Sequence, residues 1–453
     1  MRNSILIFYL IIFASCSKFD DEIIDKQYYT NAKSYNISEN LAIKLYSYII
    51  KNGVITKSVA LKPIVVTENK DTLFYIINNH NGGWCIISGD SRTPEILAIS
   101  NSGSFKINEL NPGVNYWINE LKEYLKNLKK SKQIIEEIEN PIWSKIKKKE
   151  LYTKNQPSGD GFYELIHVKV ISQNDNTYGP LISTKWGQTD PWNQCVPFKL
   201  DLINRGYVGC IAVATAQLLY YYNSKWNNSL VAPGTGVCNG WINNYSSQFS
   251  NFSNSAWLNM SKIIGDYYGS YSSSSIFLGY VAIGTQTTFT NTDAWSTNAN
   301  LRNFLNNENI GYNYSSYNYN VVISEIINGN PVLITCQQDD FLPIYGHAWI
   351  IDGYKINSST CRFFYKWRLY SEFDENGSDT SDNNCIELDE NGYPVEYDLF
   401  EDQSICAQYF KMNWGWDGWC DDAFYSIYGN WQPSSSGSVF DPFKHIFFNF
   451  TNN

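Results

Sequence analysis

The chain is poor in the residues that several functional classes require. Only 17% of its 453 residues are charged, its net charge is −10, and it has four histidines. This balance argues against nucleic acid as the main partner, because no basic surface is available for phosphates. The sequence also lacks a Walker or dinucleotide-binding glycine loop, and none of its ten cysteines is spaced as Cys-x-x-Cys. A zinc site is therefore not expected, and neither is any other metal or cofactor.

The sequence does have what a large folded core requires. It is 43% hydrophobic and 16% aromatic, with 15 tryptophans and 34 tyrosines. A chain of this length and composition suits two or three domains and is not expected to be mostly disordered. Residues 181–453 hold 12 Lys and Arg against 25 Asp and Glu, whereas residues 1–180 have a balance of +3. A basic leading half and an acidic trailing half suit two domains that dock on each other.

The first 16 residues resemble a bacterial lipoprotein signal. A short positive head precedes the apolar run Ser4–Ala14, which is too short to be a stable membrane span. Small residues then lead to Cys16, which would become the lipidated first residue, and an acidic stretch follows at Ser17–Glu22. The resemblance implies an exported protein on the bacterial outer membrane or cell surface, or one released after maturation. An ordinary secretory signal with a coincidental cysteine is the alternative.

The leading half predicts a small α+β domain over residues 17–143. A polar, lysine-rich stretch then predicts a linker at residues 144–180, in which we expect an activating cut between about Lys145 and Leu181. Hydrophobic periodicity and turn residues place the elements of the domain. The expected helices are 38–51 and 114–130, and the expected strands are 72–77, 84–89 and 95–100.

The trailing half, residues 181–453, has helical patterns first and strand-like patterns later. Its helix begins at Cys210, and the expected strands are 332–336, 347–354, 408–414 and 424–428. Residues 357–404 are rich in acids, so we expect a solvated insertion there. A calcium role for this segment is an alternative, although it has no EF-hand pattern.

Cys210 is the candidate nucleophile. It opens the apolar helical stretch Gly209–Tyr220, and the first turn of a helix favours an anion through the macrodipole and free N–H groups. That position lowers the pKa of a thiol and supplies the reactive thiolate. The alternative is a cysteine that only fills a small space in the core.

Three further residues complete a candidate thiol-peptidase site. His347 follows Cys210 by 137 residues, within the range of roughly 130–150 for a papain-type base. Asn413 would orient the imidazole and Trp414 would shield that hydrogen bond from water, although 203 residues separate Asn413 from Cys210. Gln188, 22 residues before Cys210, would donate to the oxyanion. Each of these residues alone is equally compatible with an ordinary structural role.

These motifs together resemble the streptopain family of papain-like cysteine peptidases. The resemblance implies an α+β fold with a two-lobed papain-like catalytic domain, and a catalytic set of Cys210, His347 and Asn413 with Gln188 and Trp414. It implies protein or peptide substrates with a hydrophobic residue just upstream of the cut residue, and a membrane contact only through the lipid. The insertion 357–404 departs from the family and accounts for the long spacing to Asn413. The matching segments are 184–197, 209–217, 346–354 and 413–418.

The leading half resembles the inhibitory propeptide of the same family. Residues 84–92 and 94–100 look like its central strand pair, which implies an intramolecular inhibitor and a zymogen. Two other classes stay open: a catalytically silent surface binding or inhibitor protein that keeps the peptidase fold, and an acyl transferase. The presence of the full catalytic set disfavours the first, and Asn413 in place of an aspartate disfavours the second. Eight further cysteines leave disulfides open without defining their pairing.

Overall fold

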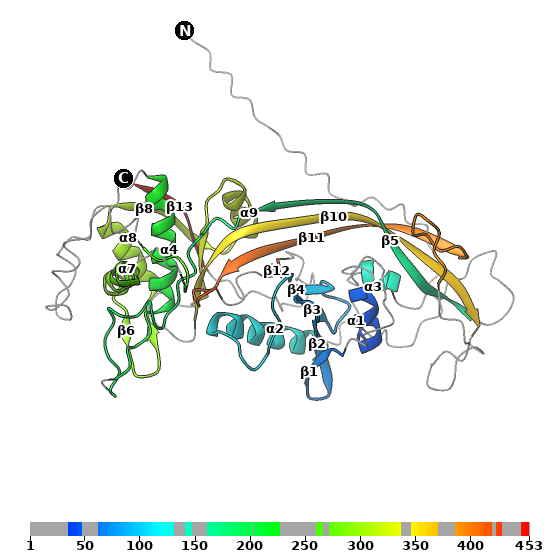
Figure 1. Cartoon of the computed structure of the whole chain (residues 1–453), viewed down its shortest axis with the longest axis horizontal. Helices are drawn as coiled ribbons and strands as arrows, with labels where there is room; N and C mark the ends of the chain where they lie inside the picture. The colour runs from blue at the N-terminus through cyan, green and yellow to red at the C-terminus, as the bar shows by residue number, and fades with distance from the viewer. Residues whose placement is uncertain are drawn as a thin grey trace, which may run out of the picture. The chain divides into compact units, whose positions relative to one another are not determined.

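Short strands joined by tight turns form the sheet of the leading region (Figure 1). The computed structural model describes residues 35–47, 62–130, 141–146, 161–201, 203–226, 260–265, 271–336, 346–369, 386–418, 423–427 and 445–452. The three strands expected here are confirmed as β2 (Asp71–Asn78), β3 (Trp84–Ser88) and β4 (Ile96–Ser100). An additional strand, β1 (Ile64–Glu68), pairs with β2 at the edge.

Helices cover both faces of this sheet. The amphipathic α2 (Pro112–Lys130) buries Trp117 and Leu121 in the hydrophobic cluster on one face. The short α1 (Glu39–Leu45) and α3 (Pro141–Ile146) belong to the cluster on the other face. The helices expected at 38–51 and 114–130 are thus confirmed in their described parts.

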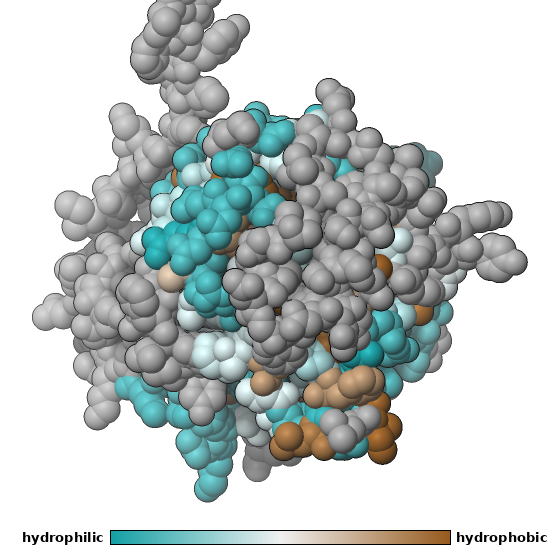
Figure 2. All heavy atoms as spheres, turned by 90° about the vertical axis from the view of Figure 1, so that its left-hand side faces the viewer, coloured by the Kyte–Doolittle hydropathy of each residue, from teal (hydrophilic) through white to brown (hydrophobic). Residues whose placement is uncertain are grey.

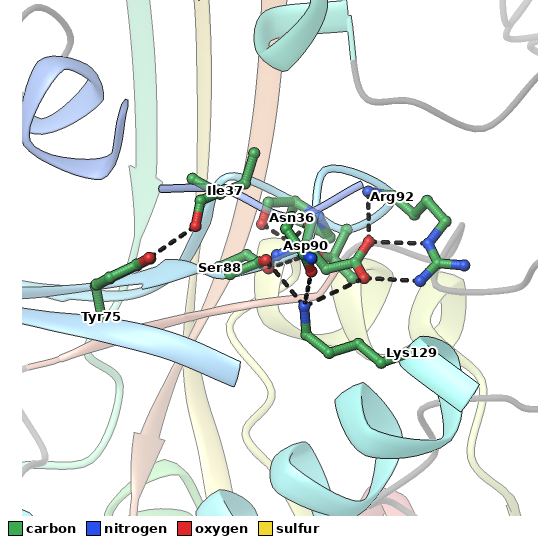
Figure 3. Close-up of polar contacts among 10 residues, drawn as sticks. Asn36, Ile37, Tyr75, Ser88, Asp90, Arg92 and Lys129 are labelled. Carbon is green, nitrogen blue, oxygen red and sulfur yellow. Dashed lines mark hydrogen bonds and ion pairs between the residues drawn. The ribbon is translucent and has the colours of Figure 1, made fainter. Parts of the chain in front are cut away.

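A buried ion-pair network fixes the loop after β3 (Figure 3). The Asp90 carboxylate accepts from Arg92 Nη2 at 2.7 Å and lies 3.9 Å from Lys129 Nζ. Lys129, at the end of α2, also donates to Asn36 Oδ1 at 2.7 Å and to the Gly89 carbonyl at 3.2 Å. The network therefore ties the segment before α1, the loop after β3 and the end of α2 to one another.

The trailing region begins with a helical lobe. α4 (Cys210–Lys225), α7 (Tyr271–Gly284) and α8 (Asn298–Asn307) share a hydrophobic cluster. α4 is apolar on nearly every side, as expected for a helix enclosed by other elements. A two-stranded hairpin of β6 (Thr288–Phe289) and β7 (Ala294–Trp295) lies between α7 and α8 in sequence.

A sheet lobe follows the helical lobe along the chain. The order of its strands is β12-β11-β10-β9-β13-β8, and all of these pairs are antiparallel. α9 precedes β9 and packs its buried face against this lobe. The bounds are β8 (Ile310–Ser316), α9 (Tyr319–Ile327), β9 (Val332–Thr335), β10 (Ala348–Leu369), β11 (Leu399–Asn413), β12 (Phe424–Ser426) and β13 (His445–Asn452).

The two regions share one continuous sheet. β4 pairs with β12 through Ile99↔Phe424 and Ala98↔Tyr425, which joins the leading sheet to the trailing one. The Trp117 ring of α2 packs edge-on to Tyr425 at 5.0 Å across the same boundary. Residues Tyr35–Asn453 accordingly form one compact unit. The expected α+β class is confirmed.

The segment expected to be a linker contains a long strand. β5 (Gly161–Tyr178) lies within residues 144–180 and pairs antiparallel with β10 along its whole length. Residues 171–177 of β5 are exposed, so the segment reads as polar in the sequence although its backbone is paired. Residues 162–171 hold seven hydrophobic residues in ten and carry a strand signal, so only the polar second half of β5 resembles a linker in composition.

The acidic insertion is also more ordered than expected. Its first part extends β10 to Leu369, and its last part begins β11 at Leu399. We call β5, residues 354–369 of β10 and residues 399–410 of β11 the arm; Figure 1 shows these strands running side by side. Residues 370–385 of the insertion, with five of its twelve acids, lie outside the described residues.

The sequence left open whether the cysteines form disulfides, and it predicted a lipidated cysteine at the end of a signal segment. The described cysteines are free thiols, and no disulfide joins them: Cys85, Cys195, Cys210, Cys336, Cys361 and Cys406. Cys16 and the signal segment lie outside the described residues. Within the described part of the chain, no helix has both the length and the apolar character to cross a bilayer.

Candidate active site

A cavity of about 760 Å³ opens at the start of α4. Cys210 and Gln188 line it from the helical side, and His347 lines it from the start of the sheet lobe. The first turns of α2 close another side through Pro112 and Tyr116. Three of the five predicted catalytic side chains and the leading domain therefore meet at one place.

Cys210 is the first residue of α4. Gly209 before it has φ of 98°, a conformation that favours glycine, and a side chain there would come within 3.1 Å of Thr287 Cγ2. The helix therefore starts immediately after a turn that other residues would strain. This turn sets the Cys210 thiol at the cavity wall.

The pKa of Cys210 differs from the sequence expectation. Burial raises the pKa of the thiol to about 11, although backbone N–H groups of Ala348 and Ile211 favour the thiolate. The nearby Asp293 carboxylate adds to the rise. Desolvation of the charged form thus outweighs the helix N-terminus, and the thiol is neutral in this closed state.

His347 is buried immediately before β10. Its Nε2 lies 3.3 Å from the Trp414 carbonyl oxygen, and its ring stacks on Trp349 at 5.9 Å. Burial lowers the pKa of this histidine to about 4, against the opposing effect of the Trp414 carbonyl. His347 is therefore neutral at pH 7, as Cys210 is, and no ion pair forms between them.

Asn413 ends β11 and is engaged away from the imidazole. Its Nδ2 donates to the Thr184 carbonyl at 2.8 Å, and its Oδ1 accepts from Gln217 Nε2 at 3.0 Å and from the Gly415 N–H at 3.2 Å. Among the described residues, no hydrogen bond joins Asn413 to His347. The orienting contact expected for a papain-type site is thus not formed in this state.

Sequence reasoning missed Gln217, which holds Asn413. It lies seven residues after Cys210, two turns further along α4. Its Oε1 accepts from the Trp186 N–H at 3.1 Å, so one amide joins the segment before Gln188 to the end of β11. A polar side chain within an otherwise apolar helix was the signal that could have identified it.

Gln188 and Trp414 contact different parts of the site. Gln188 Oε1 accepts from the Gly209 N–H at 3.2 Å, which holds the side chain next to the start of α4. Trp414 is fully buried, donates from Nε1 to Tyr425 Oη at 3.2 Å, and packs on Trp349 at 5.0 Å. Gln188 therefore lies beside the thiol, whereas Trp414 lies beneath the histidine.

The leading domain approaches the histidine through a glycine. A Cβ placed on Gly113 would lie 2.6 Å from Trp414 Cε3 and 2.8 Å from His347 Nε2. No other residue would allow α2 to lie this close without displacing one of the two rings. Close packing of α2 is what buries His347 and holds it in its present position.

The β6–β7 hairpin forms another wall of the cavity. The Thr290 N–H donates to the Asp293 carbonyl at 2.8 Å, and Asp293 lines the cavity. Asn291 Oδ1 accepts from the Leu200 N–H at 2.8 Å, so the hairpin also supports the loop before α4. Leu200 and Ile203 on that loop are 84% and 79% exposed, and Figure 2 shows exposed hydrophobic side chains gathered at the lower edge of this side of the molecule.

Two family models match the chain in succession. Residues 186–368 match the peptidase C10 family, and residues 35–125 match the Spi protease inhibitor. The first range includes Gln188, Cys210 and His347, and the second includes β1–β4 and the part of α2 that covers them. We call residues 35–130 together with α3 (Pro141–Ile146) the inhibitor domain.

Streptopains are similar to part of the chain. Streptopain of Streptococcus pyogenes is 27% identical over 155 residues, which is 33% of this chain and 32% of that protein. Streptopain of Streptococcus pyogenes serotype M1 matches equally. The match thus spans about a third of the length of these relatives.

Two solved structures from Prevotella intermedia are also similar. A prointerpain A fragment is 17% identical, with 86% of this chain and 98% of that chain covered at a TM-score of 0.48. Active interpain A is 15% identical, with 60% and 94% covered at a TM-score of 0.34. On the strength of the two family models and the streptopain match, the chain carries a peptidase C10 domain, of the streptopain family, behind an inhibitor domain of the Spi type.

Proposed function

We propose that this protein is a cysteine endopeptidase made as a zymogen. One observation carries the proposal: Cys210, His347 and Gln188 line a single cavity, and the first turns of α2 cover it. A nucleophile, a base and an oxyanion donor around one space are the parts that acyl transfer to water needs. The covering helix comes from a domain that matches a protease inhibitor.

The reaction follows from the chemistry of these side chains. Cys210 Sγ attacks the carbonyl carbon of the peptide bond, and His347 takes the thiol proton and passes it to the leaving amine. Water then hydrolyses the thioester, with His347 as the base, and releases the acid and Cys210. Gln188 Nε2 and the Cys210 N–H would bind the oxyanion, while Asn413 would orient the imidazole and Trp414 would shield it.

The described state is the closed form of such an enzyme. Cys210 and His347 are both neutral, and Asn413 is bonded to Gln217 instead of His347. Activation then requires α2 to leave, so that the histidine can turn toward the thiol and exchange its Trp414 contact for Asn413. The substrate class is protein or peptide, with a hydrophobic residue just upstream of the cut residue.

Export and lipidation at Cys16 belong to the same proposal. The apolar run and the cysteine at its end support a bacterial outer-membrane or cell-surface lipoprotein. The alternative function is a surface binding or inhibitor protein without turnover. The presence of Cys210, His347, Gln188 and Asn413 favours the enzyme.

Self-processing of residues 17–453 tests the proposal. Wild type and Cys210→Ala are purified, incubated with mild reductant and followed by intact mass. We expect the wild type to be cut into two pieces, the smaller of about 130–160 residues, in line with the segment between the inhibitor and peptidase domains, and Cys210→Ala to stay whole.

If neither protein is processed, trypsin is added and an epoxide inhibitor of thiol proteases is used to label Cys210. Labelling of the wild type but not of a His347→Ala variant would support a peptidase activated by another protease. Absence of labelling in every form, including the peptidase fragment after it has been separated from the inhibitor fragment, would favour the silent binding protein.

A further inference from the structure

The arm has two faces that differ in what covers them. Side chains alternate along a strand, so neighbouring residues point to opposite faces. Phe363 is fully buried in the cluster shared with the inhibitor domain. Phe364, also buried, contacts Tyr397 at 4.9 Å and Phe400 at 6.2 Å on the other face. The sequence of the insertion thus supplies one face to the inhibitor domain and covers the other face itself.

The cluster on the Phe363 face joins the inhibitor domain to the arm. From the arm it includes the fully buried Tyr365 and, from β5, Val168. From the inhibitor side it includes Leu45 of α1 and Trp143 of α3, both fully buried. Cys210 and His347 are not members of this cluster. The arm therefore contacts the inhibitor domain at a place separate from the cavity.

Polar contacts reinforce the same surface. Glu164 of β5 pairs with Lys44 of α1 at 3.3 Å and with Arg368 of β10 at 3.3 Å. Lys145 of α3 pairs with Glu401 of β11, and the Lys145 carbonyl accepts from Tyr365 Oη at 3.2 Å. These contacts connect α1 and α3 to all three strands of the arm.

We propose that the arm is a second holding site for the inhibitor domain, so that cutting the connecting segment does not release it. β5 is paired over Gly161–Tyr178, so a cut before Gly161, at residues 147–160, leaves the arm whole. A cut there leaves α1, α2 and α3 on one fragment and the complete arm on the other. Because the hydrophobic cluster would be exposed on both fragments, separation is unfavourable. The insertion 357–404 then serves to retain the inhibitor after cleavage.

The proposal is tested without catalysis, in the full chain carrying Cys210→Ala. Limited trypsin is directed at the lysines Lys147, Lys148, Lys149 and Lys154, and the nicked protein is run on native size-exclusion columns over a dilution series. We expect both fragments to elute together at micromolar and nanomolar concentrations. Separation of the fragments at micromolar concentration would overturn the proposal.

Adjacent substitutions identify the surface. Phe363→Ala, on the inhibitor face, should raise the dissociation constant of the nicked complex at least about 30-fold, from the usual cost of a buried Phe→Ala change. Phe364→Ala, on the opposite face, is the matched control and should change it several-fold less. Phe363→Leu and Phe364→Leu replace this pair if the alanine variants do not fold. An equal effect of both substitutions would show that the arm face does not hold the inhibitor.

The holding site itself does not depend on the proposed function. Its consequence, that the cavity stays covered after the cut, does rest on it. That consequence is read from nicked wild type by epoxide labelling of Cys210. Co-elution without labelling supports it when the peptidase fragment, once separated from the inhibitor fragment, is labelled. Rapid labelling of a complex that stays together overturns it. Since co-elution is measured in Cys210→Ala, a failure of peptidase activity leaves the holding site unaffected, and the reverse is also true.

Discussion

At the cavity, the inhibitor domain touches the peptidase region through the first turn of α2, where Gly113 lies against His347 and Trp414. At the arm, it contributes one side of a broad hydrophobic cluster that includes Trp143 and Phe363. The first contact depends on a few atoms at close range, and the second depends on buried area. A single substitution can therefore disturb the contact that blocks the cavity. The contact that holds the domain at the arm is spread over many residues and is less sensitive to any one of them.

The two contacts also differ in their charges. α2 packs against His347 and lines the cavity that Cys210 also lines, and both groups are neutral at pH 7. At the arm, partly exposed ion pairs such as Glu164–Lys44 surround the apolar cluster. We expect the cavity contact to act mainly on protonation and reactivity, and the arm contact mainly on affinity.

The largest expected effect is on the reactivity of Cys210. With the pKa raised to about 11, about one thiol in 10⁴ is ionised at pH 7. The thiolate is the form that alkylates, so in the closed chain the rate should rise about tenfold for each pH unit between 7 and 10. The measurement is iodoacetamide modification followed by peptide mapping, with the exposed Cys406 as internal reference.

Iodoacetamide modification of Cys210 after activation tests the difference between the closed and the open state. Once α2 has left, Cys210 is hydrated and can pair with the His347 imidazolium, so modification near pH 7 should be faster by a factor of about 10³. An unchanged rate at pH 7 would show that the inhibitor domain does not control the state of the thiol.

Asp90→Asn should weaken both contacts, because the network of Figure 3 holds the inhibitor domain together. The substitution removes the carboxylate that Arg92 and Lys129 share while both side chains stay buried, at a cost of about 3–5 kcal/mol. We expect a lower melting temperature and faster modification of Cys210. Glu109→Gln, which removes an exposed ion pair with Lys106, is the control and should change neither. Equal melting temperatures for the two variants would contradict a stabilising role of Asp90.

Gly113→Ala should disturb the cavity contact alone. The added methyl would meet the His347 and Trp414 rings, and such overpacking costs about 1–3 kcal/mol. Modification of Cys210 at pH 7 should accelerate about 10- to 100-fold. The nicked fragments should still elute together at micromolar concentration, since the arm is untouched.

The control for this substitution is Glu123→Ala, at an exposed position further along α2. If Gly113→Ala released the fragments while Cys210 stayed unreactive, the division of roles between cavity and arm would be reversed.

Glu164→Gln should have the smallest effect and should act at the arm. It removes two partly exposed ion pairs, with Lys44 and Arg368, which together are worth about 1 kcal/mol or less. The dissociation constant of the nicked complex should rise by about fivefold or less in low salt, and the difference should shrink as salt is added. A loss as large as that of Phe363→Ala would mean that charge, rather than buried area, holds the inhibitor domain.

Local sequence patterns were sufficient to predict most strands and helices of the leading domain. Strands β2–β4 and helix α2 follow from alternation, turn residues and helical periodicity, all of which act over a few residues. β5 and the outer parts of β10 and β11 were not foreseen, because their stability comes from pairing with distant strands. Asp90 and Arg92 lie within the propeptide-like segment 84–92, but their ion-pair network also needs Lys129, which lies 39 residues from Asp90 in sequence.

Part of the candidate site could also be predicted from the sequence, and part required the structure. The choice of Cys210, His347 and Gln188 came from the sequence, and the structure places all three around one cavity. The role of Gln217 and the present partners of Asn413 required the packing of α4 against the end of β11. The direction of the Cys210 pKa shift was expected from the helix N-terminus alone and was wrong for the closed state, because burial depends on the whole surroundings.

The sequence by itself determined the α+β class, the family resemblance and the residues able to carry thiol chemistry, since these depend on residue types and short-range spacing. Only the tertiary structure decided that the two regions share one sheet, that α2 covers His347 through a glycine, and that the insertion and β5 form an arm that packs against the inhibitor domain. The reason is that burial, strand pairing and desolvation arise between segments far apart in the chain, and no local pattern records which distant segment will be the neighbour.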